Sequence, residues 1–459
     1  MKNIYAIVLT GLVLVSCKEF DADINKDPNN PSTASADQLL SNAQIGLQDV
    51  SHSLSGQFYA QYLSETEYIA ASQYPVESTS FYGWYQGPLM NLQTILENEM
   101  GTTNQQAVAK ILKAYYFWFL TDRWGDIPFT EALQGAKNLT PVYDTQESIY
   151  ASLLDLLEEA EGSIDEALPI PNDIIFGGDM VQWKKLANSI RMLMALRMSE
   201  VDETTAEMVF ESAAAAGVMT SNDDSFIFQH LSDENNWSYW YGQIGVQGRE
   251  WWALSATLTA NMTNDPRIAV FGAPDSGGDG STYTGLVFGT DDGIDASAVS
   301  LLGTNIWEPE APVYLITYAE LLFAQAEAAQ RGWITGGDAQ AQMYYEEGIE
   351  ASFLQWIGNT DSLAAFLVEP TVVYAPGTAL EQIAIQKYIH LFMNGYEAWA
   401  EYRRTGFPNN MVAPLGRSVP LRQIYVETEQ FNNTENYMDA VQRQFGGNDG
   451  LYEALWWDQ

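Results

Sequence analysis

Two long stretches joined by a four-residue turn decide the fold class of this chain. Residues 313–333 read VYLITYAELLFAQAEAAQRGW, residues 334–337 read ITGG, and residues 338–358 read DAQAQMYYEEGIEASFLQWIG. Apolar side chains recur at helical spacing in both stretches, and small residues stand where two helices must approach each other. The glycines favour a tight turn between them. The pattern predicts a pair of helices of the tetratricopeptide type.

Other parts of the chain carry the same helical signals. Asp37 is expected to cap a first helix, Thr145 another, and Gly125 and Gly406 are expected to end two more. The sequence therefore predicts a mainly α protein built from tetratricopeptide-like helix pairs. The remaining helices are expected at 38–50, 104–125, 145–164, 182–201, 205–219 and 379–406.

The chain between about 220 and 312 differs from these helical stretches. It is rich in Gly, Asp, Ser and Trp and shows little helical periodicity, and a shorter irregular patch covers 72–87. Long irregular segments inside helical proteins frequently carry function. We therefore interpret 36–459 as a single α-helical domain whose irregular insertion at about 220–312 forms the ligand-binding region.

Charge and residue usage exclude several classes of function. Sixty acidic and 20 basic residues give a formal net charge of −40, which repels the phosphates of nucleic acids and the headgroups of anionic lipids. The three histidines, His52, His230 and His390, lie far apart and form no zinc-binding or triad motif. The glycines of GQIGVQG (242–248) have the wrong spacing for a dinucleotide turn. We expect no cofactor, no metal site and no enzymatic activity.

Two exceptions to this expectation stay open in the sequence alone. The acidic, glycine-rich stretches 275–281 and 291–295 offer oxygen ligands to calcium, although neither has EF-hand spacing. With 60 acidic residues, a pair of carboxylates suited to glycoside hydrolysis can also arise by chance. Solvated turns and a solvated acidic surface are the simpler interpretations of both features.

The only cysteine, Cys17, follows an apolar stretch at the N-terminus. Lys2 precedes this stretch, which is too short to span a membrane and is typical of a signal peptide. LVSC (14–17) resembles a bacterial lipobox, in which cleavage exposes a cysteine that is then acylated. We therefore expect a signal peptide at 1–16 and a lipidated Cys17 with a tether at 17–35, anchored to the membrane by its acyl chains. A secretory signal with a coincidental cysteine is the alternative.

Aromatic side chains crowd both irregular stretches and are the candidate ligand-binding residues. Flat aromatic faces match the C–H faces of sugar rings, and Tyr hydroxyls and indole N–H groups supply hydrogen bonds. Nearby Gln243, Asn235 and Asn236 can bond hydroxyl groups. The alternative is that many of these aromatics pack the loops onto the helices. The candidates are Trp240, Trp237, Tyr239, Tyr241, Trp84, Tyr82, Tyr74, Arg249 and Trp307.

Several segments, taken in order, resemble one family. FLTDRWGDIPFTEAL (119–133), WKKLANSIRMLMALRM (183–198) and EAWAEYRRTGFP (397–408) are similar to segments of the SusD/RagB nutrient-binding outer-membrane lipoproteins. Residues 312–329 and 417–441 follow the same order, and the closest resemblance is to the SusD-like subgroup. On their own chemistry these motifs are structural: Glu327, for example, is expected to satisfy a buried group.

The resemblance implies a lipoprotein on the surface of a Bacteroidota outer membrane. It implies four tetratricopeptide-like pairs that pack against a SusC-like TonB-dependent transporter, to which the protein delivers a nutrient. The aromatic loops favour an oligosaccharide or polysaccharide as this nutrient. A peptide ligand, as in the RagB-like members, stays the alternative within the family. A surface glycoside hydrolase and a scaffold that only docks a partner are the alternatives outside it.

Overall fold

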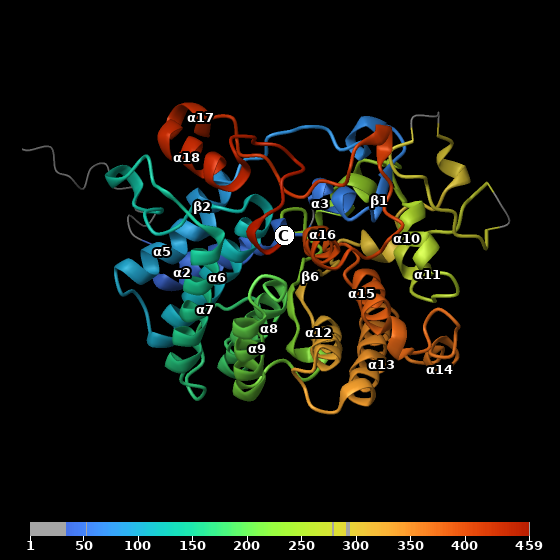
Figure 1. Ribbon diagram of the computed structural model, residues 1–459, viewed down its shortest axis with the longest axis horizontal. Helices are drawn as coiled ribbons and strands as arrows, with labels where there is room; N and C mark the ends of the chain where they lie inside the picture. Colours follow the sequence, from blue (N-terminus) through green and yellow to red (C-terminus); the bar gives the residue numbers. More distant parts are fainter. Residues whose placement is uncertain (1–33, 52, 278–279, 291–293, 459) are drawn as a thin grey trace, which may run out of the picture.

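The computed structural model describes residues 34–51, 53–277, 280–290 and 294–458. Long helices run side by side across the lower half of Figure 1, and short strands, short helices and irregular segments lie above and to the right of them. The predicted mainly α fold is confirmed. Cys17, the signal peptide and most of the tether lie outside the described residues.

Most of the long helices pack against the helix that follows them in the chain. Helix α6 packs against α7, α8 against α9, and α12 against both α13 and α15. These helices are α2 (Ala36–Ile45), α5 (Met90–Glu97), α6 (Thr103–Trp124), α7 (Gln146–Ser163), α8 (Met180–Arg197), α9 (Glu203–Ala216), α12 (Tyr318–Arg331), α13 (Gly337–Trp356), α15 (Ala379–His390) and α16 (Gly395–Thr405). Shorter helices are α3 (Leu54–Tyr59), α4 (Tyr82–Trp84), α10 (Ala256–Asn261), α11 (Ile268–Phe271), α14 (Leu363–Phe366), α17 (Glu429–Asn432) and α18 (Thr434–Phe445).

Short antiparallel ribbons tie the irregular segments to the helices. Each ribbon in the described part of the chain has two strands, and two of the ribbons bring the segment 220–312 against distant parts of the chain. Leu63 lies opposite Leu254, and Phe228 lies opposite Val313. The pairs are β1 (Leu63–Glu65) with β5 (Trp252–Leu254), β2 (Ile127–Pro128) with β3 (Tyr143–Asp144), and β4 (Phe226–Phe228) with β6 (Val313–Ile316).

Local capping explains where several helices begin and end. The Thr102 side chain accepts a hydrogen bond from the Gln105 backbone and starts α6, and the Thr145 side chain starts α7 in the same way. Gly125, at φ 82°, ends α6, and Gly406, at φ 75°, ends α16. Positive φ is costly for residues with a Cβ atom, so glycine suits both positions. The predicted cap at Thr145 and the ends at Gly125 and Gly406 are confirmed.

The first helix has a different cap from the predicted one. Ser35, not Asp37, is the N-cap of α2: its hydroxyl accepts from the Gln38 backbone, while the Gln38 side chain accepts from the Ser35 backbone. Asp37 lies one residue inside the helix, where its carboxylate accepts from the Gln105 side chain. The capping box at Ser35 is preferred because it satisfies two backbone N–H donors at once.

The predicted helix over 313–333 begins later than expected. Val313–Ile316 is the strand β6, and the Thr317 side chain caps α12 by accepting from the Glu320 backbone. This run of branched and aromatic residues has a high β-propensity, and pairing with β4 decides its conformation. The prediction of a helix was therefore wrong for Val313–Ile316, which form a strand.

The predicted long helix over 379–406 is two helices, α15 and α16. The backbone of Gly395 lies against the backbone of Gly56 in α3, so closely that a Cβ atom at Gly395 would overlap it. Asn394 Nδ2 donates to the Leu315 carbonyl at 3.1 Å and holds the connection between the helices. These tertiary contacts override the helical propensity of the continuous stretch.

Replacing Gly395 by alanine is expected to lower the free energy of unfolding by about 2 kcal/mol, because the new methyl group collides with the Gly56 backbone. Gly162→Ala is the matched control, since open space surrounds that position inside α7. It is expected to stabilise the protein by up to about 1 kcal/mol. Urea unfolding measures the free energy of unfolding of both variants. If Gly395→Ala and Gly162→Ala changed it in the same direction, the packing described here would be contradicted.

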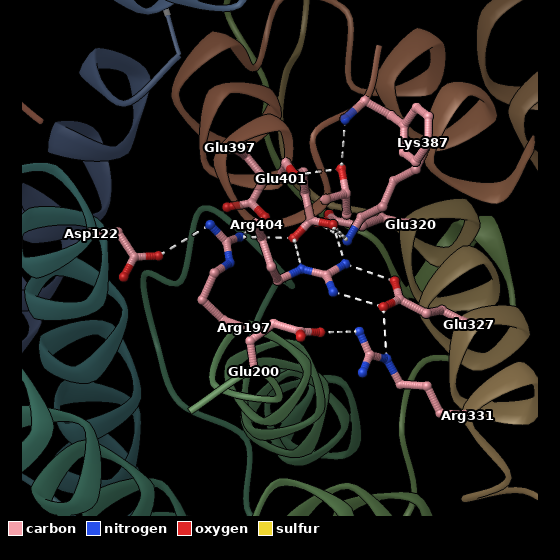
Figure 2. Close-up of polar contacts among 12 residues, drawn as sticks. Asp122, Arg197, Glu200, Glu320, Glu327, Arg331, Lys387, Glu397, Glu401 and Arg404 are labelled. Atoms are coloured by element: carbon pink, nitrogen blue, oxygen red, sulfur yellow. Dashed lines mark hydrogen bonds and ion pairs between the residues drawn. The ribbon is translucent and has the colours of Figure 1, made fainter. Parts of the chain in front are cut away.

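A buried network of ion pairs joins α8, α12, α15 and α16 (Figure 2). Arg404 donates through two nitrogens to the two carboxylate oxygens of Glu327, at 2.7 Å each, and to Glu401 at 2.8 Å. Lys387 Nζ lies 3.1 Å from Glu401, and Arg197 lies 3.3 Å from it. The interpretation of Glu327 as the partner of a buried group is confirmed. The network fixes the mutual positions of helices that are far apart in sequence.

The two carboxyl groups at the centre of this network have opposite pKa shifts. Burial alone would raise the pKa of Glu401, but Arg404, Lys387 and Arg197 hold it well below its usual value. Burial, reinforced by the charge of Glu397, raises the pKa of Glu320 to about 8. Lys387 Nζ is 3.9 Å from Glu320, too far for a hydrogen bond. Burial therefore favours the protonated form of Glu320.

Candidate functional site

An open groove of about 480 Å³ lies between two short helical turns that are far apart in sequence. One is the 3₁₀ turn η2 (Gly46–Asp49), which follows α2, and the other is the π-helix η7 (Tyr241–Val246) inside the irregular segment. The volume falls in the range of small-molecule sites, and π-helical turns are frequent at functional positions. The residues lining it are Gln48, Asp49, Trp237, Tyr239, Gly242, Gln243, Val246 and Gln247.

Hydrogen bonds hold the loop that leads into η7. Asp233 accepts from the Asn236 side chain at 2.8 Å and closes a tight turn. The Ser238 backbone donates to the Pro309 carbonyl at 2.8 Å, and the Ser238 hydroxyl donates to the Glu308 carbonyl at 2.8 Å. The loop is therefore attached to a second irregular segment, and its aromatic residues are held in place.

The aromatic residues of this loop divide into a buried anchor and a partly exposed surface. Trp240 is 6% exposed and meets Trp252 edge-on, with ring centroids 5.3 Å apart. Tyr239 packs edge-on against Trp240 at 5.4 Å, and Trp237 packs against Tyr241 at the same separation. Trp237, Tyr239 and Tyr241 are half-buried. Trp240 thus fixes the loop, while Trp237 and Tyr239 line the groove.

One glycine lets an aromatic ring lie against the π-helix. A Cβ atom at Gly245 would collide with the ring of Tyr241 and lie 3.4 Å from the ring of Trp307. At Gly242 it would be in ordinary contact with Trp237, 3.4 Å from Nε1. The structure therefore gathers Trp237, Tyr239, Trp240, Tyr241 and Trp307 around η7.

The predicted polar residues near the loop are largely engaged with one another. Arg249 Nη1 donates to Gln243 Oε1, and its guanidinium carbon lies 4.3 Å from the ring centroid of Trp251. The Asn236 amide bonds Asp233. Arg249 therefore orients Gln243 in the groove wall and does not itself line the groove.

The second aromatic stretch lies elsewhere. Tyr74 is fully buried, and its hydroxyl accepts a hydrogen bond from Gln61 at 2.6 Å. Trp84 packs against Phe119 of α6 at 5.2 Å, and Tyr82 donates to a carboxylate of α17. None of the three lines the groove. Trp84 and Tyr82 hold their segment on α6 and α17, and Tyr74 packs against Tyr59 and Phe288. Tyr74 belongs to the hydrophobic core, which corrects its expected place on an accessible surface.

A deeper cavity of about 190 Å³ shares Tyr239 with the groove. It lies where α13, β6 and the connection between α15 and α16 meet the aromatic loop. Its lining is mostly apolar and aromatic, and consists of Ser51, His230, Ser238, Tyr239, Trp240, Val270, Asn305, Ile306, Ala311, Pro312, Val313, Tyr314, Gln355, Trp356, Phe392 and Met393.

The polar groups of this cavity have distinct roles. Trp356 Nε1 donates to the His390 carbonyl at 3.1 Å, and its ring meets Tyr314 at 5.1 Å. Burial raises the pKa of Tyr314 to about 12, so its hydroxyl stays protonated. Gln355 Nε2 is buried and has no hydrogen-bond partner among the described residues. Gln355 is therefore the polar group in the cavity wall whose hydrogen bonding the fold leaves incomplete.

Sequence reasoning missed several residues of the groove and the cavity. The sequence predicts an ordinary helix that ends with Gln48 and Asp49, and nothing local predicts that these two residues face residues near 240. It likewise predicts Tyr314 and Gln355 in helices, with no functional signal. Long-range packing, which a local pattern does not contain, brings these residues to the site.

In the described ranges, no group of three or more His, Cys, Asp or Glu side chains is placed to hold a metal ion. Both stretches considered for calcium include residues outside those ranges. Among the helices that the structure describes, none is long and apolar enough to cross a membrane.

Comparisons with known proteins place the chain in a family. The model of the SusD-like family described as "Starch-binding associating with outer membrane" matches residues 28–425. The chain belongs to this SusD-like family, whose members are associated with the outer membrane. No curated protein matches the chain.

Solved structures agree with this assignment. A chitin-binding protein is 30% identical, with a TM-score of 0.80 over 92% of this chain and 100% of the other. A SusD homologue from Bacteroides fragilis is 30% identical, with a TM-score of 0.82 over 93% of this chain and 100% of the other. A chitin-binding SusD homologue from Flavobacterium johnsoniae, 24% identical with a TM-score of 0.77 over 92% and 97%, shares the fold.

Proposed function

We propose that this protein binds an oligosaccharide or polysaccharide in the groove beside η7 and delivers it to a SusC-like TonB-dependent transporter. The observation that carries the proposal is the pairing of Trp237 and Tyr239 with amide side chains on one open groove. Aromatic faces stack on sugar rings, and amides donate to and accept from hydroxyl groups. A ligand with both apolar faces and many hydroxyls fits this lining.

The charge of the groove supports binding without hydrolysis. Asp49 is the one carboxylate among the described residues that line it. Glycoside hydrolysis needs two carboxyl groups on either side of the scissile bond. The net charge of −40 further favours a neutral glycan over a polyanionic one, because long-range repulsion slows the approach of an anion.

Similarity to known proteins supports the same ligand class. The family description names starch, and a full-length structural relative at 30% identity is named as chitin-binding. A neutral polymer of glucose-type units is common to both names. A peptide ligand stays the alternative, and calorimetric titration with oligopeptides tests it alongside the sugars.

Cell-surface attachment and transporter delivery complete the proposal. The lipobox-like segment ending at Cys17 supports acylation there, which holds the protein at the outer membrane. The family resemblance supports the part of the proposal that concerns the transporter. Replacing Cys17 by alanine is the direct way to release the protein from the membrane fraction.

Trp237→Ala is expected to weaken glycan binding about 5- to 30-fold, on the order of 1–2 kcal/mol, because the groove loses an aromatic face. The measurement uses the soluble chain beginning at Lys18, first in gels containing a panel of neutral and anionic polysaccharides. Calorimetry with the matching oligosaccharides then gives the affinity.

Phe431→Ala is the matched control, since Phe431 is 74% exposed on α17 and does not line the groove. It is expected to bind as the unmodified protein does. Trp84→Ala separates the two aromatic stretches. If it abolishes binding while Trp237→Ala does not, the ligand binds on the stretch 72–87 and the assignment to the groove beside η7 is wrong. Binding of peptides alone would overturn the glycan proposal.

A further inference from the structure

We propose that the cavity next to Tyr239 receives the acetamido group of an N-acetylated sugar bound in the groove. The proposal rests on the proposed function and makes it more specific. Tyr239 lines both spaces, so a substituent on a sugar stacked in the groove can enter the cavity at this residue. The groove then binds the sugar chain, and the cavity selects its substituent.

The size and lining of the cavity suit a small group with an apolar end. Its volume of about 190 Å³ is larger than a hydroxyl group needs and too small for a chain of sugars. Trp240, Trp356 and Phe392 supply aromatic walls, and Ala311 and Val313 supply aliphatic ones. A methyl group gains by leaving water for such surroundings, whereas a bare hydroxyl does not.

Gln355 supplies the polar complement. Its buried Nε2 has no partner among the described residues, so an acceptor from the ligand satisfies a donor that the fold leaves unpaired. An acetamido group presents both a C=O and an N–H. It therefore pairs with the carboxamide of Gln355 in either orientation of that side chain.

The cavity also discriminates by charge. None of the described residues that line it is Asp, Glu, Lys or Arg. An ammonium group there would lose its hydration without gaining a counter-ion, which is strongly unfavourable. The cavity is therefore expected to accept the N-acetyl group and reject the free amine of the deacetylated sugar.

This local preference opposes the long-range electrostatics of the protein. A net charge of −40 attracts a cationic glucosamine oligomer and has no such effect on the neutral N-acetylated one. Tighter binding of the neutral oligomer would therefore come from the cavity and not from the surface field. Measuring at high ionic strength screens the surface attraction further.

The experiment is calorimetric titration of the chain beginning at Lys18 with three tetrasaccharides: chitotetraose, its fully deacetylated counterpart, and cellotetraose. Chitotetraose is expected to bind about tenfold more tightly than cellotetraose, which has hydroxyls in place of the acetamido groups. The deacetylated oligomer is expected to bind more weakly than chitotetraose at high ionic strength. Equal affinity for chitotetraose and cellotetraose would overturn the proposal and leave glycan binding intact.

Gln355→Met tests the residue, because methionine keeps the length of the side chain and lacks its amide. Chitotetraose affinity is expected to fall about tenfold, while cellotetraose affinity stays unchanged. Gln342→Met is the control on the same helix, where Gln342 bonds Glu346 away from the cavity. An equal loss for both sugars with Gln355→Met would contradict the proposal.

Ala311→Leu provides a second, independent variant. The larger side chain fills part of the cavity and is expected to remove the preference for chitotetraose while cellotetraose still binds. Thermal unfolding confirms that each variant is folded before titration. If no saccharide binds the unmodified protein at all, the proposed function fails together with this inference.

Discussion

Replacing Arg404 by methionine is expected to lower the free energy of unfolding by about 3–5 kcal/mol. Arg404 donates to both oxygens of Glu327 and to both oxygens of Glu401, and all three side chains are buried. Without the guanidinium, two carboxylates lose their main counter-charge in a place that water does not reach. Urea unfolding at neutral pH measures the change.

Two further variants show that the effect belongs to the buried network. Lys110→Met breaks the pair between Lys110 and the exposed Glu159, 2.7 Å apart, and is expected to cost less than about 1 kcal/mol. Adding Glu327→Gln to Arg404→Met is expected to recover part of the loss, because it removes a buried carboxylate that keeps Arg331 as its one ion-pair partner among the described residues. A loss no larger for Arg404→Met than for Lys110→Met would contradict the network as described.

The second large effect concerns the dependence of stability on pH. Glu320 has a pKa of about 8 in the folded protein and an ordinary value of 4.5. Between these values the folded chain keeps a proton that the unfolded chain releases, so stability falls as pH rises through this window. The fall attributable to Glu320 is on the order of 4 kcal/mol.

Glu320→Gln is expected to remove this fall, because glutamine resembles the protonated acid and does not titrate. The variant should match the unmodified protein near pH 4.5 and exceed it in stability at pH 8. Glu401→Gln has the opposite sign: the pKa of Glu401 is lowered, so its charge stabilises the fold above pH 4.5 and the variant is weakened at neutral pH. Unfolding curves at several pH values measure the stability of both variants. If the stability of Glu320→Gln and of the unmodified protein depended on pH in the same way, the raised pKa of Glu320 would be refuted.

Local sequence patterns predict the helices, but they do not predict where a helix is interrupted. Helices such as α6 and α7 have caps and apolar periodicity that local reasoning recognises. The strand at Val313–Ile316 and the break before Gly395 arise from contacts with β4 and with Gly56, both distant in sequence. Local propensity therefore predicts that an element exists more reliably than it predicts where the element stops.

The same limit applies to the site. The density of rings in a loop singles out the aromatic run 237–241, and Trp237 and Tyr239 line the groove while Tyr239 and Trp240 line the cavity. Tyr74 and Trp84 have the same local appearance, yet Trp84 packs on α6 and Tyr74 packs in the core against Tyr59 and Phe288. Gln48 and Gln355 gave no signal, since a lone glutamine gains a role only through the residues that face it.

A crystal structure of the chain beginning at Lys18 with a bound chitooligosaccharide shows directly where the sugar binds. We expect sugar rings against Trp237 and Tyr239 in the groove beside η7, with an acetamido group in the cavity next to Gln355. Sugar bound over the segment around Trp84, or anywhere away from η7, would contradict both the proposed groove and the proposed cavity.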